Sequence, residues 1–539
     1  MNKTSNSPSP DPTASPAKTT RQRGLLGSSF LVSSMTFLSR ILGLIRDIVL
    51  ARLIGASPLA DAFFVAFKIP NFLRRLFAEG AFSQAFVPVL SEYRQQGSHA
   101  AVKALVDRVA AALGSVLILV TVLAVVGAPA LTTLFAPGFW NDEVRFAATS
   151  EMIRITFPYL LLISLTGLAG GILNSYDRFA IPAFTPVWLN VSLITAALVA
   201  APWFEEPAFA LAWGVLVAGV IQLLFQLPFL RQLHLLPTPV MDWKHPGVRR
   251  ILKLMVPALF GVSVSQINLL LDTVIASFLP AGSVSWLYYS DRLSELPLGV
   301  FAVALGTVIL PNLSRQHAAK SVEQFTRIMD WALRLVLLIA IPAAIALMIL
   351  AQPILVTLFY YGDVMTQRDI AMASYSLMAY SAGLVMFMLI KILAPGYYAR
   401  QDMVTPVKIG VIAMVSNMAL NLLFATPLHV YWQLGHVGLA AATAAAALIN
   451  ASLLWRGLRK KGVYTPQPGW WRFGVQMLSA NGAMAAVLFF WGRHLIDWAA
   501  AGWFDRVWAM ALVCAIGLGV YLLVLAVTGI RLRHLRYRG

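Results

Sequence analysis

Charged side chains are scarce in this sequence: aspartate, glutamate, lysine and arginine make up 12% of the 539 residues, whereas hydrophobic types make up 59%. A soluble protein of this length would carry about twice that charged fraction. The longest polar stretch, Met1 to Arg23, is rich in Ser, Thr and Pro, a composition typical of a disordered tail. The composition therefore leaves no separate soluble domain and indicates a membrane protein.

Cysteine and several chemical motifs are also missing. Cys514 is the only cysteine, so one chain can form neither a disulfide nor a cysteine-based metal site. The sequence contains no Gly-x-x-x-x-Gly-Lys-Ser/Thr loop, no His-Glu-x-x-His and no Gly-x-Ser-x-Gly. Its first residues lack the apolar core and cleavage site of a signal peptide, so we expect no processing. We predict a non-enzymatic protein that needs no cofactor and binds no metal.

Long apolar runs recur from about Leu25 to about Val527, and each is long enough to cross a bilayer. In lipid such runs must be helices, because every backbone polar group needs an internal partner. We predict an all-α polytopic membrane protein with about fourteen transmembrane helices. The predicted spans are approximately 26–54, 60–93, 103–136, 148–175, 182–202, 208–232, 249–279, 284–316, 326–359, 369–399, 404–426, 435–458, 471–494 and 504–528.

The net charge of +18 would suggest nucleic acid as a partner of a soluble protein. In a membrane protein, loop cations instead set the topology, so we expect no nucleic-acid partner. Every second connection is basic, whereas the alternate ones, such as Gly55 to Pro58, are poor in cations. This pattern predicts a multi-pass membrane protein with both termini in the cytoplasm.

An internal repeat with an offset of about 220 residues is visible. Pro88-Val89-Leu90-Ser91 corresponds to Pro311-Asn312-Leu313-Ser314, and Asp47-Ile48-Val49-Leu50-Ala51 to Asp272-Thr273-Val274-Ile275-Ala276. Because the offset covers six spans, the two halves have the same orientation, which predicts a pseudo-twofold axis along the membrane normal. We expect a tail (1–24), two pseudo-symmetric six-helix lobes (25–235 and 245–462), two further helices (469–530) and a basic cytoplasmic tail (531–539).

Ionisable residues inside the spans are the most informative feature. In span two, Asp61, Lys68, Arg75 and Glu79 recur at helical spacing, so an α-helix would point them in one direction along about 27 Å. Arg74 flanks this stripe. The other intramembrane charges are Arg40, Arg46 and Asp47 in span one and Asp291, Arg292 and Glu295 in span eight.

These charges have two interpretations: a hydrated cavity, or structural ion pairs and snorkelling side chains. About ten ionised groups facing lipid would cost roughly 25–35 kcal/mol, so they must face a cavity or one another. A span-long stripe favours the cavity. Arginine binds phosphate in bidentate fashion and keeps its charge at any relevant pH, whereas a proton relay would favour acids and histidines. We therefore predict a site for an anionic substrate.

Several blocks resemble the MurJ (MviN) family of lipid II flippases. They are SRILGLIRD (Ser39 to Asp47), KIPNFLRRLFAEGAFSQAFVPVLSEY (Lys68 to Tyr93), GSVSWLYYSDRLSELPLGV (Gly282 to Val300), LAPGYYARQDMVTPVKI (Leu393 to Ile409) and TPQPGW (Thr465 to Trp470). The resemblance covers nearly everything after about residue 24. It implies a member of the MOP exporter superfamily, in which two lobes enclose a cavity and two C-terminal helices form a groove for the lipid tail.

The resemblance also implies roles for particular residues. The family's substrate-binding arginines match Arg40, Arg46, Arg74, Arg75 and Arg292, and its acids match Asp47, Asp61, Glu79, Asp291 and Glu295. The expected activity is movement of lipid II to the periplasmic leaflet by alternating access, driven by the membrane potential, with other cell-wall synthesis proteins as potential partners. The alternatives are a flippase for another polyprenyl-diphosphate glycan, of the O-antigen type, and a membrane-embedded glycan polymerase.

Overall fold

The computed structural model describes residues 17–319, 321–361 and 364–530; within these, it leaves out the side chains of 17–31, 33, 77–79, 260–265 and 302–308. Every regular element in the described ranges is a helix, which confirms the all-α class. The first helix, α1, begins at Ala17, so part of the predicted tail 1–24 is helical. No proline lies between Pro16 and Pro58 to stop this helix. The predicted tail 531–539 lies outside the described residues.

The first six predicted spans form an N-terminal group of helices. Its elements are α1 (Ala17–Ile54), α2 (Pro58–Arg74), η1 (Arg75–Phe82), α3 (Ser83–Gln96), α4 (His99–Val126), α5 (Ala128–Phe135), η2 (Pro137–Asn141), α6 (Glu143–Thr156), α7 (Tyr159–Ser175), α8 (Ala180–Thr195), η3 (Ala196–Ala200), η4 (Ala201–Trp203) and α9 (Pro207–Gln232).

The next six spans form a C-terminal group, and two more helices follow it. The elements are α10 (Pro246–Ser277), α11 (Ser283–Pro297), η5 (Leu298–Ala302), α12 (Val303–Ala318), α13 (Val322–Ile349), α14 (Ala351–Phe359), α15 (Gln367–Tyr398), α16 (Val404–Trp432) and α17 (Gly435–Lys460), and then α18 (Trp470–Phe490), η6 (Gly492–His494) and α19 (Trp503–Val527).

Two predicted spans are shorter than expected, and in the same way. The spans predicted at 103–136 and 326–359 break after Val126 and Ile349, and a short helix, α5 or α14, follows each break. Prolines in the first turn of α5 and near the start of α14 favour these new helix starts, because proline suits the first positions of a helix and not its interior.

The backbone repeats beyond the matches seen in the sequence. A π-helical segment begins at Arg75 (η1), directly after α2, and another begins at Leu298 (η5), directly after α11, 223 residues later. The breaks after α4 and α13 are also 223 residues apart. π-helical segments inside α-helices are rare and often lie at functional sites, so their equivalent positions support an internal duplication.

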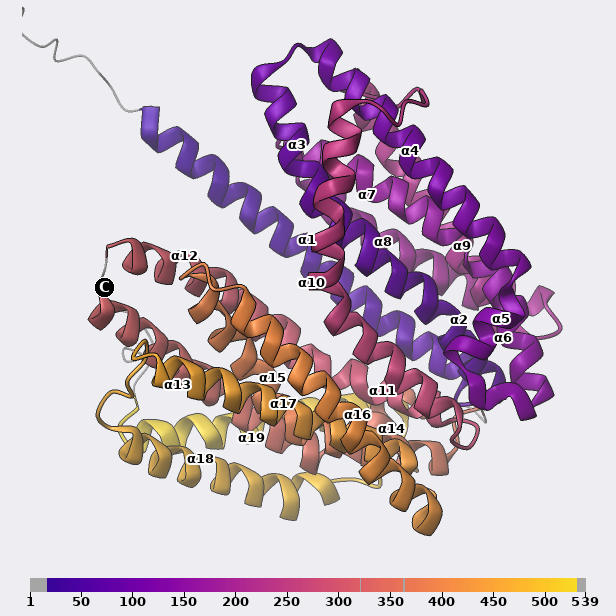
Figure 1. Cartoon of the computed structure of the whole chain (residues 1–539). Coiled ribbons are helices and arrows are strands. Elements are labelled where there is room, and N and C mark those ends of the chain that lie inside the picture. Colours follow the sequence, from indigo (N-terminus) through magenta and orange to yellow (C-terminus); the bar gives the residue numbers. More distant parts are fainter. Residues whose placement is uncertain (1–16, 320, 362–363, 531–539) are drawn as a thin grey trace, which may run out of the picture.

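The two groups lie side by side, with α10 running between them (Figure 1). α10 packs against α3 and η1 of the N-terminal group and also against α16 of the C-terminal group. α10 therefore belongs to both groups, although its sequence starts the second repeat. α18 and α19 pack against α13 and α14, on the side of the C-terminal group that faces away from the N-terminal one (Figure 1).

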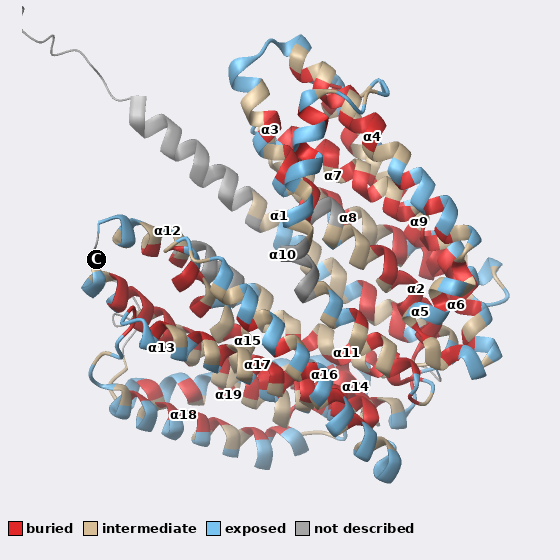
Figure 2. Cartoon of the chain, in the orientation of Figure 1, coloured by how far each residue is buried: buried red, intermediate tan, exposed pale blue. Residues whose placement is uncertain are grey.

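Buried residues concentrate where helices face one another, and exposed ones lie on the outer faces (Figure 2). Many exposed residues are large and apolar, for example Leu198, Leu478 and Leu523, each more than 60% exposed. Among the described residues, ten helices are long and apolar enough to cross a membrane. α1, α2, α10 and α11 are not among these ten, and these four helices contribute most of the lining of the central cavity.

Candidate substrate-binding site

A cavity of about 270 Å³ lies between the two groups, lined mainly by α2, α10 and α11 with single residues of α1, η1, α8, α15 and α17. Its charged lining residues are Arg46, Lys68, Arg74, Arg75, Asp272, Asp291, Arg292 and Glu295. All except Asp272 were predicted from the sequence as site residues. The structure therefore brings together most of the predicted charges from spans one, two and eight.

Arg46 is held at the wall of this cavity and is only 3% exposed. Its Nε and Nη2 donate to Oδ1 of the neighbouring Asp47 at 2.9 and 2.6 Å, and its Nη1 donates to Oδ1 of Asn190 at 3.1 Å. Asn190 in turn donates to the carbonyl oxygen of Ser39. These bonds tie α1 to α8 and fix the guanidinium in one orientation.

Residues of α11 meet this cluster from the other group. The Tyr288 hydroxyl donates to Asp47 Oδ1 at 2.9 Å and lies 3.0 Å from Arg46 Nη2. Arg292 lies above the Tyr288 ring, 3.4 Å from Asp47 Oδ2 and 3.4 Å from Glu295 Oε2. Its side chain is 35% exposed. Because contacts of 3.4 Å are weaker than those of Arg46, Arg292 is the more loosely held of the two arginines.

The two walls of the cavity carry different charges. The N-terminal wall carries Arg46, Lys68, Arg74 and Arg75, whereas the C-terminal wall carries three acids and Arg292. Among the described lining residues, five basic and three acidic groups leave a net charge of +2. An excess of positive charge in a partly dehydrated space attracts anions.

Three predicted residues with described side chains, Arg40, Asp47 and Asp61, do not line the cavity. Asp47 lies behind the lining and contacts Arg46 and Arg292. Arg40 lies against Gly299 of η5, so closely that a Cβ on this glycine would collide with its guanidinium. Asp61 lies at one end of the groups, as described below. The side chain of Glu79 lies outside the described residues. A stripe from Asp61 to Glu79 in one direction assumed an α-helix throughout, but η1 is π-helical and changes the phase after Arg74.

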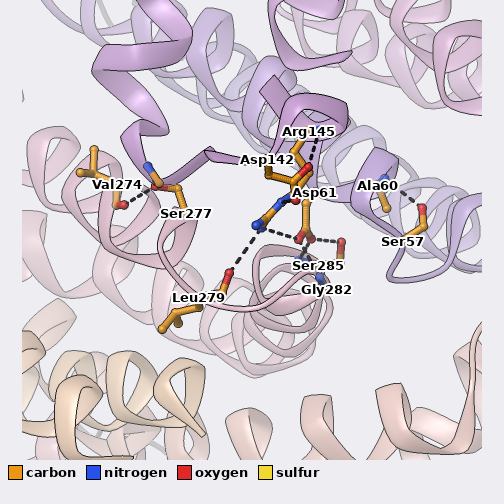
Figure 3. A network of polar contacts seen from close by, with 11 residues as sticks. Ser57, Ala60, Asp61, Asp142, Arg145, Val274, Ser277, Leu279, Gly282 and Ser285 are labelled. Atoms are coloured by element: carbon orange, nitrogen blue, oxygen red, sulfur yellow. Dashed lines mark hydrogen bonds and ion pairs between the residues drawn. The ribbon is translucent and has the colours of Figure 1, made fainter. Parts of the chain in front are cut away.

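A network of polar contacts joins the two groups at the end where Asp61 lies (Figure 3). The fully buried Asp61 carboxylate accepts hydrogen bonds from the backbone N–H groups of Gly282 and Ser285 at 2.7 and 2.9 Å, and from the Ser285 hydroxyl at 2.6 Å. A carboxylate of α2 therefore caps the N-terminus of α11, where free N–H groups favour negative charge.

A second set of contacts closes the same end. Arg145 of α6 donates to the carbonyl oxygen of Leu279 at 3.3 Å and lies 4.0 Å from Asp61 (Figure 3). The Gly138 N–H donates to the Ser277 hydroxyl at 2.9 Å. The opposite ends of the two groups diverge in Figure 1. The N-terminal and C-terminal groups are thus joined at the end of the molecule where the connections 55–57 and 278–282 lie.

Sequence reasoning missed three residues of the site: Asp272, Asn190 and Tyr288. Asp272 Oδ1 accepts hydrogen bonds from Asn417 and Asn421 at 3.1 and 2.8 Å. The repeat contained a signal for Asp272, because it matches Asp47 at the same offset. Nothing in the sequence pointed to the other two, since an asparagine or tyrosine inside a span carries no formal charge.

The described residues contain no group of three or more His, Cys, Asp or Glu side chains that could hold a metal ion. The arrangement of arginines with hydroxyl and amide groups instead provides hydrogen-bond donors for an oxyanion.

Comparison with known proteins links this arrangement to one family. A family model described as "Lipid II flippase MurJ" matches residues 50–506. A protein of Vibrio cholerae named "Probable lipid II flippase MurJ" is 49% identical over 528 residues, which cover 96% of this chain and 98% of that protein. A protein of Burkholderia cenocepacia named "Lipid II flippase MurJ" is 44% identical, over 94% of this chain and 98% of its own length.

Solved structures agree with these sequence relatives. "Lipid II flippase MurJ, inward closed conformation" superposes with a TM-score of 0.77 at 27% identity, covering 92% of this chain and 98% of that one. An inward-facing multidrug resistance MATE family transporter of the MOP superfamily has a TM-score of 0.64 at 16% identity, over 80% of this chain and 98% of its own. The second likeness shows a shared fold alone.

Proposed function

Since this chain belongs to the MurJ family of lipid II flippases, we propose that it moves lipid II from the cytoplasmic to the periplasmic leaflet of the bacterial inner membrane. The observation that carries the proposal is the cluster of Arg46, Asp47, Tyr288 and Arg292, in which both halves of the molecule meet at one cationic point in the cavity. A diphosphate is the part of lipid II that such a cluster would bind.

Arg292 is the residue proposed to contact the diphosphate first. Its ion pairs are long and its side chain is one-third exposed, so a phosphate oxygen can replace Asp47 or Glu295 as its partner without opening a buried structure. Arg46 already uses its three guanidinium nitrogens on Asp47, Asn190 and Tyr288. Arg46 therefore acts as a fixed positive charge behind Arg292.

The basic residues of α2 and η1 extend the site. Lys68, Arg74 and Arg75 line the same cavity, and we propose that they face the rest of the headgroup. Asp291 and Glu295 face them from α11, and Lys68 lies within electrostatic range of Asp272 and Asp291. We propose that these acids compete with the substrate for the cations and so keep binding reversible.

The transport cycle follows from the unequal ends of the cavity. Asp61, Arg145 and Gly138 join the groups at one end, which we assign to the periplasm because the connections at the other end carry the clusters of cations. This arrangement corresponds to a state that admits substrate from the cytoplasm. Rocking of the lobes 25–235 and 245–462 would break these contacts and expose the cavity outward.

The membrane potential supplies a driving force. An inside-negative potential favours outward movement of an anion by about 2.3 kcal/mol per charge at 100 mV, so two charges gain about 5 kcal/mol. The polyprenyl tail would remain in lipid or against the helices in 469–530. Both chain termini would lie in the cytoplasm, and other cell-wall synthesis proteins are proposed partners.

The decisive experiment measures which leaflet holds lipid II in cells depleted of this protein. We expect lysis, with lipid II protected from a probe added outside the inner membrane. Unchanged exposure of lipid II to that probe would contradict the proposal. Retention of an O-antigen-type precursor instead, with normal lipid II exposure, would assign the chain to the alternative substrate.

A further inference from the structure

A second cavity lies far from the central one, among α13, the start of α18 and the residues after α19. It has a volume of about 300 Å³. Two arginines, Arg334 and Arg472, line it together with apolar residues such as Leu335, Leu338 and Ile530. Neither arginine was predicted as a substrate-binding residue. Part of the lining falls within 469–530, against which the polyprenyl tail was proposed to lie, but that apolar tail has no use for the two cations.

The depth of this cavity is set by the connection between α17 and α18. That connection runs along α13, where Thr326 donates to the carbonyl oxygen of Val463 and Asp330 accepts from Tyr464. α18 therefore starts next to the middle of α13 and not at its end. Trp470 and the 86% exposed Trp471 begin α18, and tryptophan is enriched where a membrane meets water.

Arg334 is held in place for binding. Its Nε lies 2.8 Å from Oδ2 of the buried Asp330, whose Oδ1 accepts a hydrogen bond from Trp470 Nε1 at 2.7 Å. Its Nη2 donates to the carbonyl oxygen of Pro468 at 2.9 Å. Its Nη1 lies 3.8 Å from the position that a Cβ on Gly469 would occupy, so this nitrogen is next to Gly469, which lines the cavity.

Arg472 contributes the net charge, because Asp330 already balances Arg334. Among the described residues, no acidic side chain forms an ion pair with Arg472. Its Nη2 lies 3.5 Å from the Cβ position of Gly529, at the end of α19. Towards the membrane interior the lining becomes apolar, with Leu335 and Leu338 one and two turns beyond Trp331.

We propose that this cavity binds the phosphate of an anionic phospholipid from the cytoplasmic leaflet, with one acyl chain along Leu335 and Leu338. Basic pockets between helices on the cytoplasmic side are suited to such headgroups. The assignment to the cytoplasmic leaflet rests on the orientation given under the proposed function; the binding itself does not. Occupancy would brace α18 and α19 against the C-terminal lobe.

The test is a titration of the purified full-length chain in detergent with dioleoylphosphatidylglycerol, followed by native mass spectrometry. Arg472→Ala should weaken binding about fivefold, the equivalent of about 1 kcal/mol for one basic residue near the surface. Arg456→Ala is the matched control, because Arg456 is also exposed but lies outside the cavity lining. Leu335→Trp fills the cavity without changing its charge and should also weaken binding.

The outcomes separate this proposal from the lipid II proposal. Arg292→Ala should keep its affinity for phosphatidylglycerol while losing lipid II, so a failure at one site leaves the other intact. Equal affinity of Arg472→Ala and Arg456→Ala would overturn the phospholipid site, as would equal binding of dioleoylphosphatidylcholine. Full displacement by millimolar inorganic phosphate would show an anion site that does not recognise lipid, and would overturn it too.

Discussion

The two lobes of this protein share a backbone plan but differ in charge. α1 carries Arg46 and Asp47 where α10, 225 residues later, carries Leu271 and Asp272. An asparagine from the equivalent helix of the same lobe lies near each aspartate. Arg46 donates to both Asp47 and Asn190 of α8, and Asp272 accepts directly from Asn417 of α16. The duplication has thus kept the acid and the amide, and only the N-terminal copy has the cation.

This difference shows how a symmetric fold makes an asymmetric site. A substrate with one diphosphate needs one cationic point, and two equivalent ones would compete for it. The N-terminal wall supplies Arg46, Lys68, Arg74 and Arg75, while the C-terminal wall supplies mainly acids. Arg292 is the exception on the C-terminal wall. Its position opposite Asp47 lets the two lobes exchange contacts around the bound phosphate.

The strongest test of this asymmetry is Arg292→Ala. We expect complementation of a depleted strain to be abolished and lipid II binding to fall at least 100-fold, because two charge-assisted hydrogen bonds are worth about 3 kcal/mol or more. Binding should be measured on the purified protein, with membrane insertion checked in parallel. Arg315→Ala, an exposed arginine of α12, is the control. Normal complementation by Arg292→Ala would refute the role of this residue.

The two equivalent aspartates should respond unequally. Asp47→Asn removes the charge that orients both Arg46 and Arg292, so we expect lipid II binding to fall about tenfold or more, by analogy with about 1.5 kcal/mol per charged hydrogen bond. Asp272→Asn leaves the arginines in place and should reduce lipid II binding clearly less than Asp47→Asn does. Equal losses in the two variants, measured in the same binding assay, would mean that the lobes contribute symmetrically.

The joined end can be loosened by one methyl group. A Cβ on Gly138 would collide with the backbone of Ser277 and Phe278, so Gly138→Ala should push the lobes apart and favour the outward-open state. Labelling of a cysteine placed near Asp61 should become several-fold faster. Gly114→Ala is the control, because its Cβ would meet nothing within 4 Å. Unchanged labelling in Gly138→Ala would show that this contact does not hold the lobes together.

The contact between Arg40 and Gly299 offers a smaller effect. Gly299→Ala should displace the Arg40 guanidinium from η5 and reduce transport several-fold without removing any charge. Gly474→Ala, whose Cβ meets nothing within 4 Å, should behave like the unaltered protein in the same leaflet-accessibility assay. If Gly299→Ala also transports normally, the position of Arg40 against η5 does not matter for transport.

The smallest effect concerns the turns between α7 and α8 and between α15 and α16. Asp402 accepts from Lys461 at 2.8 Å and from Thr405, which lowers its pKa to about 2, whereas Asp177, in the turn between α7 and α8, lies 4.0 Å from Arg94. Exposed pairs contribute up to about 1 kcal/mol, so Asp402→Asn should lower the unfolding midpoint slightly at pH 7, and more than Asp177→Asn.

The pH dependence of the Asp402 contribution has a definite sign. Because folding lowers the pKa of this carboxyl from 3.8 to about 2, its contribution is complete above about pH 5 and is lost as the pH falls through 2. The difference in unfolding midpoint between Asp402→Asn and the unaltered protein should therefore shrink between about pH 4 and pH 2 and vanish below about pH 2. A difference that persists there would have to come from a cause other than this ion pair.

Much of the fold could be predicted because the membrane leaves few choices. Apolar length, the need to satisfy every backbone group, and the repeat offset gave the helices and their order. The breaks after Val126 and Ile349 and the two π-helical segments could not be predicted from apolar length. These breaks and segments depend on how neighbouring helices pack. The apolar pattern of the sequence continues through them unchanged, so it gives no sign of them.

The sequence by itself determined that charges lie inside the membrane, on α1, α2 and α11, since about ten ionised groups cannot face lipid. Only the tertiary structure decided which of them act together. Arg46, Asp47 and Arg292 come from helices far apart in the chain, and their contacts depend on how the two lobes dock. Asp61 has the same charge as Asp47, yet it closes one end of the cavity, because the docking places it at the N-terminus of α11.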